Sequence, residues 1–171
     1  VALDISGSMG RHLPEMRRAV RAFTENLNQR DRLALGAFNT SLFVLAPLAP
    51  PGPSHLRAAE RISAFGGTAL NDALMEGLPA LPASTGRRVM IFFTDGLDQL
   101  SRSTLSDVER ALLAENILLY VVGHGAAREQ PQRDTLNRLS SRTGGRAVFI
   151  RDIGNDLHDA FADLIRDIKS Q

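Results

Sequence analysis

The sequence contains no cysteine and no tryptophan, a single tyrosine and a single lysine. The lack of cysteine excludes disulfide bonds and thiolate metal sites, and it leaves the redox compartment undetermined. Apolar runs stay far below the roughly 20 residues that cross a bilayer, and no signal peptide is recognisable at the start of the chain. We therefore predict no direct membrane insertion by this segment.

Net charge is nearly absent as well. The chain carries 20 basic and 19 acidic residues, a formal net charge of +1 at pH 7. The basic residues are spread along the sequence, so we expect no nucleic acid partner. A length of 171 residues predicts one domain over 1–171. Because only Val1 to Asp4 remain of the first expected strand, we expect this domain to be a fragment of a longer protein.

Short apolar segments alternate with amphipathic ones. Strands are expected at 1–4, 33–38, 42–46, 89–93, 117–122 and 147–150. The turn at Asn39-Thr40 is so short that the two strands around it must be antiparallel, at an edge of the sheet. The other connections contain helices. We therefore predict an α/β fold with a doubly wound, mostly parallel six-stranded sheet, one antiparallel edge strand and helices on both faces.

Local signals delimit several of the helices. Ser54 is a candidate N-cap for a helix that runs to about Phe65, where Gly66-Gly67 ends it. Thr104 and Asp107 resemble a capping box, with Asp in place of the usual Glu. The last helix has an apolar face from Leu157 to Ile168. The histidines at positions 12, 55 and 158 are expected at the surface.

Oxygen-bearing side chains follow two of the expected strands. Asp4, Ser6 and Ser8 lie in a Gly- and Ser-rich loop after the first strand, and Asp95 ends the fourth. Thr68 comes directly after Gly66-Gly67 and before a helix. Oxygen-only donors suit a hard divalent cation such as Mg²⁺. In open parallel sheets, ligands bind at the carboxyl ends of the strands, where the strand order reverses.

The residues Asp4, Ser6, Ser8, Thr68 and Asp95, in this order and on these elements, resemble the metal-ion-dependent adhesion site of von Willebrand factor type A domains. The resemblance covers nearly the whole chain, and all five positions match. It implies a Rossmann-like fold in which the first and fourth strands are neighbours. It also implies a domain that binds proteins rather than an enzyme.

The resemblance further implies a metal and a mode of binding. Ser6, Ser8 and Thr68 would ligate Mg²⁺ directly, with Mn²⁺ or Ca²⁺ as other possibilities, while Asp4 and Asp95 would bind it mostly through water. An Asp or Glu carboxylate of a protein partner would complete the coordination. The last helix is the element that shifts between states in some members of the family.

Three stretches look most like bacterial members of this family. They are Gly66 to Ala73, Thr94-Asp95-Gly96-Leu97-Asp98 and Thr143-Gly144-Gly145-Arg146. Many such proteins are exported or associated with the cell envelope. We therefore expect an extracytoplasmic or secreted location, with any export signal outside this segment.

Other interpretations remain open at this point. Taken singly, Asp4 could cap the next helix, Ser6 and Ser8 could be turn residues, Thr68 could be an N-cap, and Asp95-Gly96 an ordinary turn. The same metal site could also serve an intracellular scaffold that recruits a partner to an ATPase or another assembly.

A serine hydrolase is the third alternative. The loop Ser6-Gly7-Ser8-Met9-Gly10 is one residue from a G-x-S-x-G elbow, and Ser8, Asp95 and His124 follow the chain order of a hydrolase triad. This interpretation leaves Asp4 and Thr68 without a role, so we favour the metal site.

Overall fold

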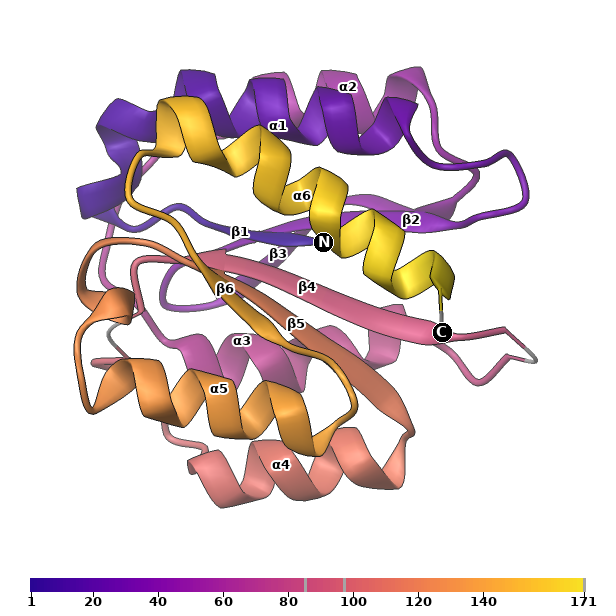
Figure 1. The fold of residues 1–171 in the computed structure, drawn as a ribbon. Coiled ribbons are helices and arrows are strands. Elements are labelled where there is room, and N and C mark those ends of the chain that lie inside the picture. Colours follow the sequence, from indigo (N-terminus) through magenta and orange to yellow (C-terminus); the bar gives the residue numbers. More distant parts are fainter. Residues whose placement is uncertain (85, 97, 171) are drawn as a thin grey trace.

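A computed structural model describes residues 1–84, 86–96 and 98–170 and is built around a central sheet (Figure 1). Within these ranges six strands lie side by side in the order β3-β2-β1-β4-β5-β6. They are β1 (Ala2–Asp4), β2 (Leu33–Phe38), β3 (Leu42–Ala49), β4 (Arg88–Thr94), β5 (Ile117–Gly123) and β6 (Ala147–Phe149). Only the β2–β3 pair is antiparallel among these described strands. The predicted sheet with its antiparallel edge strand is confirmed.

Helices cover both faces of the sheet. The α-helices of the described ranges are α1 (Leu13–Glu25), α2 (Pro53–Glu60), α3 (Leu70–Gly77), α4 (Leu105–Ala114), α5 (Gln132–Arg142) and α6 (Ile153–Ser170). Three short 3-10 helices are η1 (Gly7–His12), η2 (Leu78–Ala80) and η3 (Gly125–Arg128). Figure 1 shows α1, α2 and α6 on one face and α3, α4 and α5 on the other. The predicted helices on both faces are confirmed.

Each central strand is buried on both of its faces. Leu3 and Phe93 belong to the core beneath α1, α2 and α6, whereas their neighbours Ala2 and Phe92 belong to the core above α3, α4 and α5. Successive side chains of a strand point to opposite faces, so a strand between two helical layers needs apolar residues at every position. This explains the uninterrupted apolar runs that mark β4 and β5 in the sequence.

The prediction for the helix after residue 53 is wrong at both ends. Helix α2 begins at Pro53, with Gly52 rather than Ser54 at the N-cap, and it ends at Glu60 rather than near Phe65. The segment after Glu60 is not helical because its backbone groups form hydrogen bonds with other parts of the chain. Phe65 donates its N–H to the carbonyl of Ile5 over 2.8 Å, and the Asn39 side-chain amide donates to the carbonyl of Phe65 over 3.0 Å.

The prediction that His55 lies at the surface is also wrong. Its side chain is fully buried, and its Nε2 lies 2.8 Å from the carbonyl oxygen of Leu33. A carbonyl only accepts, so Nε2 carries the hydrogen and donates it. The bond ties the first turns of α2 to the start of β2.

The capping box predicted at Thr104 and Asp107, at the start of α4, is confirmed, with both reciprocal hydrogen bonds present.

A reciprocal clamp joins the start of α3 to the loop that follows β4. The Asp98 carboxylate accepts the N–H of Asn71 over 2.9 Å, and the Ser101 hydroxyl accepts the N–H of Asp72 over 3.0 Å. In return, the Asp72 carboxylate accepts the N–H groups of Arg102 and Ser103 over 2.9 and 2.8 Å. The loop thus caps the first turn of α3, and α3 fixes the loop.

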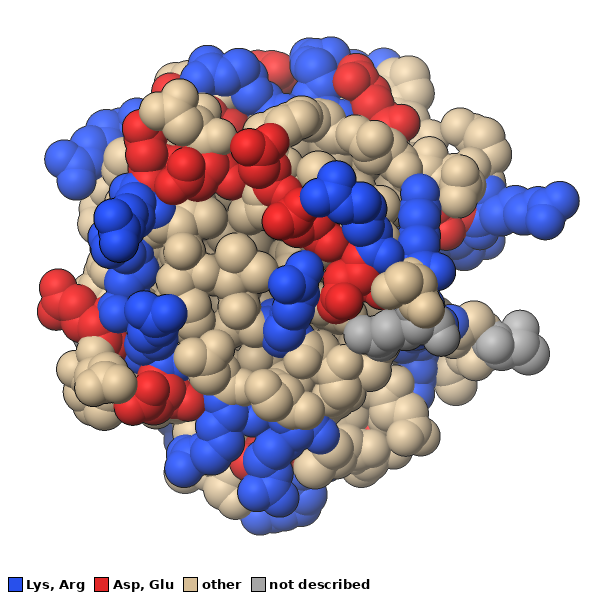
Figure 2. Space-filling model, viewed as in Figure 1, with Lys and Arg blue, Asp and Glu red and all other residues tan. Residues whose placement is uncertain are grey.

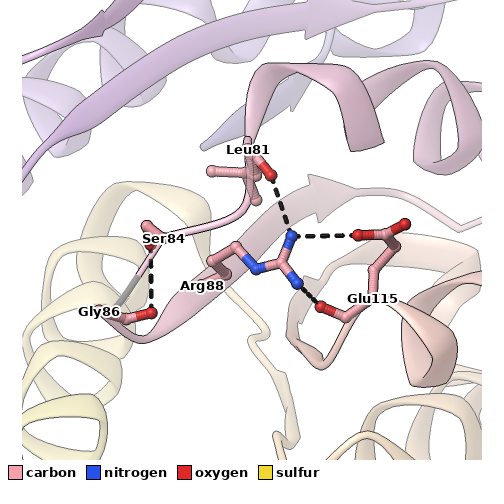
Figure 3. A network of polar contacts seen from close by, with 5 residues as sticks. All are labelled: Leu81, Ser84, Gly86, Arg88 and Glu115. Carbon is pink, nitrogen blue, oxygen red and sulfur yellow. Dashed lines mark hydrogen bonds and ion pairs between the residues drawn. The ribbon is translucent and has the colours of Figure 1, made fainter.

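A second polar network holds the opposite margin of the sheet, where β4 begins (Figure 3). The Arg88 guanidinium donates to the carbonyl of Leu81 over 3.3 Å and to the Glu115 carboxylate over 3.1 Å, and it also contacts the Glu115 carbonyl. The side chain of Arg88 is only 14% exposed. One guanidinium therefore joins the end of η2, the start of β4 and the end of α4.

The molecular surface carries charges of both signs. Figure 2 shows basic and acidic side chains interspersed over the face in view, with uncharged areas between them. No helix within the described residues is both long and apolar enough to cross a membrane.

Replacing Arg88 by Met should lower the free energy of unfolding by about 1.5–3 kcal/mol, because two carbonyls and a carboxylate lose a charged donor while the packing of the side-chain stem is kept. Urea unfolding measures the change. The matched control is Arg110→Met, whose side chain is 75% exposed and contacts Asp107 at 3.5 Å. We expect the control to change stability by less than about 0.5 kcal/mol. Equal effects of the two variants would contradict a structural role for Arg88.

Replacing Asp72 by Asn should weaken the clamp in a pH-dependent way. The hydrogen bonds from the backbone of Arg102 and then Ser103 lower the pKa of Asp72. A lowered pKa means that this carboxylate stabilises the fold above its unfolded pKa of about 3.9 and loses that effect as the pH falls through its folded value. The stability difference between wild type and Asp72→Asn should therefore narrow when urea unfolding is repeated from pH 7 down to pH 3.

The exposed Asp134→Asn variant serves as the control for this series, since among the described residues the Asp134 carboxylate accepts a single hydrogen bond, from Gln130 over 3.4 Å. Its difference from wild type should stay close to zero at every pH. A constant deficit of Asp72→Asn across the range would show that the charge of Asp72 is not what holds the loop.

Candidate metal centre

The candidate residues lie where the direction of the strand order reverses. β1 pairs with β2 on one side and with β4 on the other, and Leu3 stands opposite Phe93. Asp4 and Asp95 therefore follow neighbouring strands at the same margin of the sheet. The expected adjacency of the first and fourth strands is confirmed, and it places two carboxylates at the point where open α/β sheets bind ligands.

Asp4 is the innermost of the five residues. Its side chain is fully buried, and both carboxylate oxygens are engaged. Oδ1 accepts the N–H of Ser6 over 2.9 Å, and Oδ2 accepts the hydroxyl of Thr94 over 2.8 Å. Burial raises the pKa of Asp4, and the bonds from Ser6 and Thr94 offset only part of that effect. A buried carboxylate of this kind favours a nearby positive charge.

Ser6, Ser8 and Asp95 continue outward from Asp4. The hydroxyl oxygens of Ser6 and Ser8 are 3.2 Å apart, and the Ser8 hydroxyl donates to Oδ2 of Asp95. Ser6 is buried, whereas Ser8 is exposed and Asp95 is half-buried. These side chains therefore form one hydrogen-bonded chain of oxygen atoms that begins near the core and ends at solvent.

Thr68 is positioned by three other loops. Gly66 accepts the N–H of Gly7 over 2.9 Å, Ala69 donates to the carbonyl of Asn39 over 2.7 Å, and Thr68 accepts the N–H of Gln99 over 3.0 Å. Its side chain is buried, and within the described residues its hydroxyl makes no hydrogen bond. Ala69 rather than Thr68 is the N-cap of α3, so the alternative capping role of Thr68 is wrong.

Two supporting residues were missed in the sequence. Thr94 holds Asp4 from the neighbouring strand, and its oxygen also accepts the N–H of Gly96 over 2.9 Å. Asn39 is buried and holds Phe65, the residue that leads into Gly66-Gly67. The position of Thr94 directly before Asp95 was a usable signal, because strand alternation turns one of two successive residues inward. No local signal distinguishes Asn39 from an ordinary turn residue.

The donor set fits a hard divalent cation. It contains two carboxylates and three hydroxyls, with no nitrogen or sulfur. The described residues include no group of three or more His, Cys, Asp or Glu placed to hold a metal, so a cation here would depend on hydroxyl oxygens. Burial raises the pKa of Asp4 because it disfavours the ionised carboxylate, and a bound cation would stabilise that ionised form.

The geometry does not support the hydrolase interpretation. In a triad, the histidine bridges the serine and the carboxylate. Here Ser8 donates directly to Asp95, and the His124 ring packs edge-on against His12 with the ring centroids 5.3 Å apart. Burial, together with the charges of His12 and Arg128, lowers the pKa of His124.

Comparison with known proteins identifies a family. The model of the von Willebrand factor type A domain matches residues 1–163. No curated protein sequence matches the chain significantly. The stretch 94–98, which resembles bacterial members, includes Leu97 and so lies partly outside the described residues.

Solved structures with the same fold include bacterial and animal proteins. BatB from Bacteroides thetaiotaomicron superposes with a TM-score of 0.79 at 19% identity, over 99% of this chain and 97% of that one. The vWF domain of the type V pili tip protein Mfa5 from Porphyromonas gingivalis gives 0.79 at 11% identity, over 99% and 93%. Proximal thread matrix protein 1 from the mussel byssus, with a zinc-occupied metal-ion-dependent adhesion site, gives 0.78 at 17% identity.

The match to the mussel protein covers 96% of this chain but only 43% of that protein. At such low identities these neighbours establish the fold alone. The assignment to a family rests on the match to the family's sequence model, which spans nearly the whole chain. The observed strand order agrees with this assignment. The chain therefore belongs to the von Willebrand factor type A domain family.

Proposed function

We propose that this domain binds a protein partner through a divalent cation, with Mg²⁺ as the first candidate. One observation carries the proposal: the side-chain oxygens of Ser6, Ser8 and Asp95 form a hydrogen-bonded chain at the switch point of the sheet, and Asp4 is tied to it through the backbone N–H of Ser6. Domains of this family commonly mediate protein–protein interaction and adhesion, and the related mussel protein holds zinc at its corresponding motif.

The arrangement suggests different roles for hydroxyls and carboxylates. The Ser8 hydroxyl gives its hydrogen to Asp95 and accepts the hydrogen of the Ser6 hydroxyl, which leaves one lone pair of its oxygen available to a cation. Both oxygens of Asp4 already accept hydrogen bonds, so Asp4 is suited to act through water. We therefore assign Ser6, Ser8 and Thr68 as direct ligands, and Asp4 and Asp95 as carboxylates that orient them and balance the charge.

A cation held mainly by neutral hydroxyls remains electrophilic and attracts an additional anionic ligand. The exposed position of Ser8 and the half-buried position of Asp95 leave the outer side of the site open to a partner. An Asp or Glu side chain of that partner would complete the coordination. Type A domains are in general interaction modules rather than enzymes, and we propose the same for this chain, acting outside the cytoplasm.

The first test is thermal unfolding in EDTA and then in Mg²⁺, Mn²⁺ or Ca²⁺. A cation at 100 times its dissociation constant stabilises the fold by about 2.7 kcal/mol, which for a domain of this size raises the unfolding midpoint by roughly 5–10 °C. Asp95→Ala should remove the rise. Asp159→Ala, an exposed position on α6, should keep it. If millimolar cation leaves the midpoint unchanged, no cation binds at this site under these conditions and the proposal fails.

Asp4→Asn should separate the metal role of Asp4 from its structural role. Burial raises the pKa of Asp4, so the folded state disfavours the ionised form, and a neutral amide of the same shape removes that cost. In EDTA the variant should be at least as stable as wild type. In Mg²⁺ the order should reverse, because only wild type gains from the cation. Urea unfolding under both conditions provides the measurement.

Ser8→Ala is the companion to Asp4→Asn. Ser8 is exposed, so its loss should change stability in EDTA by less than about 0.5 kcal/mol while removing most of the gain in Mg²⁺. A uniform loss of stability for Asp4→Asn, equal in EDTA and in Mg²⁺, would mean that Asp4 only holds the loop.

A further inference from the structure

The strand order arranges two chemically different groups on opposite sides of the candidate metal centre. β2, β1, β4, β5 and β6 are parallel to one another, so their carboxyl ends meet at one margin of the sheet. Asn39 follows β2 and holds Phe65, whereas His124 follows β5 and Ile150 follows β6. The candidate metal centre lies between these groups, at the ends of β1 and β4.

On the β2 side, several large apolar side chains stand exposed, and two of them lie beside the loop that carries Thr68. Phe65 and Leu100 are each 53% exposed, although both are large hydrophobic residues. Phe65 leads into Gly66-Gly67-Thr68, and a Cβ atom on Gly67 would lie only 2.8 Å from Cδ1 of Leu100. Leu100 also donates its N–H to the carbonyl of Thr68 over 3.2 Å. These two side chains therefore flank the loop that carries a proposed metal ligand, and we call them the apolar rim.

On the β5 side, the corresponding rim is basic. Arg11 donates from Nε to Nε2 of His12 over 3.1 Å, and His12 packs against His124. Arg128, at the end of η3, follows His124 by four residues. Arg11 and Arg128 form no ion pair with any described residue. We call these two arginines the basic rim.

The basic rim is part of the same margin as the metal centre. Arg11 comes three residues after Ser8, and the backbone N–H of Ala127, next to Arg128, donates to the carbonyl of Asp95 over 2.6 Å. In Figure 2, basic side chains stand along the left margin with acidic ones among them, and the parallel strands of Figure 1 end at this margin. The two arginines thus form no ion pair with a described residue, and they belong to the same margin as a site that is proposed to take a carboxylate.

We propose that the partner segment is an acidic peptide in which the metal-binding Asp or Glu stands between a large apolar residue and a second acidic residue. The apolar residue packs on Phe65 and Leu100, and the second carboxylate pairs with Arg11 or Arg128. The inference rests on the proposed metal-dependent function and adds the chemistry of the partner on both sides of the metal. Charge complementarity selects this occupant, since the two arginines oppose a basic segment.

The test is selection of short random peptides displayed on phage, captured by the purified domain in Mg²⁺ and released with EDTA. The enriched peptides should share an Asp or Glu with an aromatic or aliphatic residue on one side and a second Asp or Glu on the other. In synthetic versions of the enriched sequence, removal of the apolar residue should weaken binding about tenfold, as expected for the loss of one packed side chain. Removal of the second acid should weaken binding several-fold, and more at low salt than at high salt.

Two double variants should separate the preference for the apolar residue from the preference for the second acid. Each variant should change one of these preferences and leave the other unchanged. Phe65→Ser with Leu100→Ser should select peptides without the apolar residue but with both acids. Arg11→Glu with Arg128→Glu should replace the second acid in the selected peptides by Lys or Arg. The matched controls are Leu113→Ser and Arg30→Glu, which are exposed positions at the opposite margin and should leave the selected sequences unchanged.

Each contrary result has a distinct meaning. Peptides that share a single acid with no preference around it would overturn this inference while leaving metal-dependent binding in place. If peptides selected by the Arg11→Glu, Arg128→Glu variant keep their second acid, the proposed pairing of that acid with the basic rim is wrong. If EDTA releases no more peptide from wild type than from Asp95→Ala, metal-dependent recognition of a carboxylate fails, and this inference fails with it.

Discussion

The candidate metal centre depends on one buried carboxylate at the end of the central strand β1. Asp4 has no exposed surface, and removing an ionised group from water costs free energy unless hydrogen bonds or an opposite charge replace the lost hydration. Two hydrogen bonds replace part of the lost hydration. One comes from the following loop, through the N–H of Ser6, and one from the neighbouring strand, through the hydroxyl of Thr94. The carboxylate thereby fixes how the loop leaves β1 and how β1 sits beside β4.

The surrounding loops are hydrogen-bonded to one another. Phe65 bonds to Ile5, Gly7 to Gly66, Ala69 to Asn39 and Gln99 to Thr68. The clamp between Asp72 and residues 102 and 103 adds a further link between α3, which follows Thr68, and the loop that follows Asp95. Because each loop is a hydrogen-bond partner of the next, a displacement of one changes the positions of the others. The three separate segments of the chain that carry the five oxygen-bearing side chains are therefore held to one another through their backbones.

Much of this arrangement could be predicted from the sequence because it follows from local rules. Uninterrupted apolar runs such as Val89 to Phe93 reflect a strand covered on both faces, and the connections between strands dictate which are parallel. The rule for open sheets then places Asp4 and Asp95 at one margin. What could not be predicted depends on contacts between distant residues. The end of α2, the burial of His55 and the support from Asn39 each depend on a backbone group from elsewhere, and no periodicity encodes such a partner.

The difference between positions held by the core and positions in surface segments also explains where partner recognition can vary within a shared fold. The residues that would bind the metal are fixed by the end of β1, by the end of β4 and by the start of α3, all of which pack against a buried core. Phe65 and Leu100 instead lie in irregular segments, and Arg11 and Arg128 lie at the ends of short 3-10 helices. Phe65, Leu100 and Arg11 are exposed, and Arg128 is half-buried. A substitution at these positions therefore changes the surface with little cost in core packing. A common metal centre can thus present different chemical surroundings to a partner, and in this chain those surroundings are apolar on one side and basic on the other.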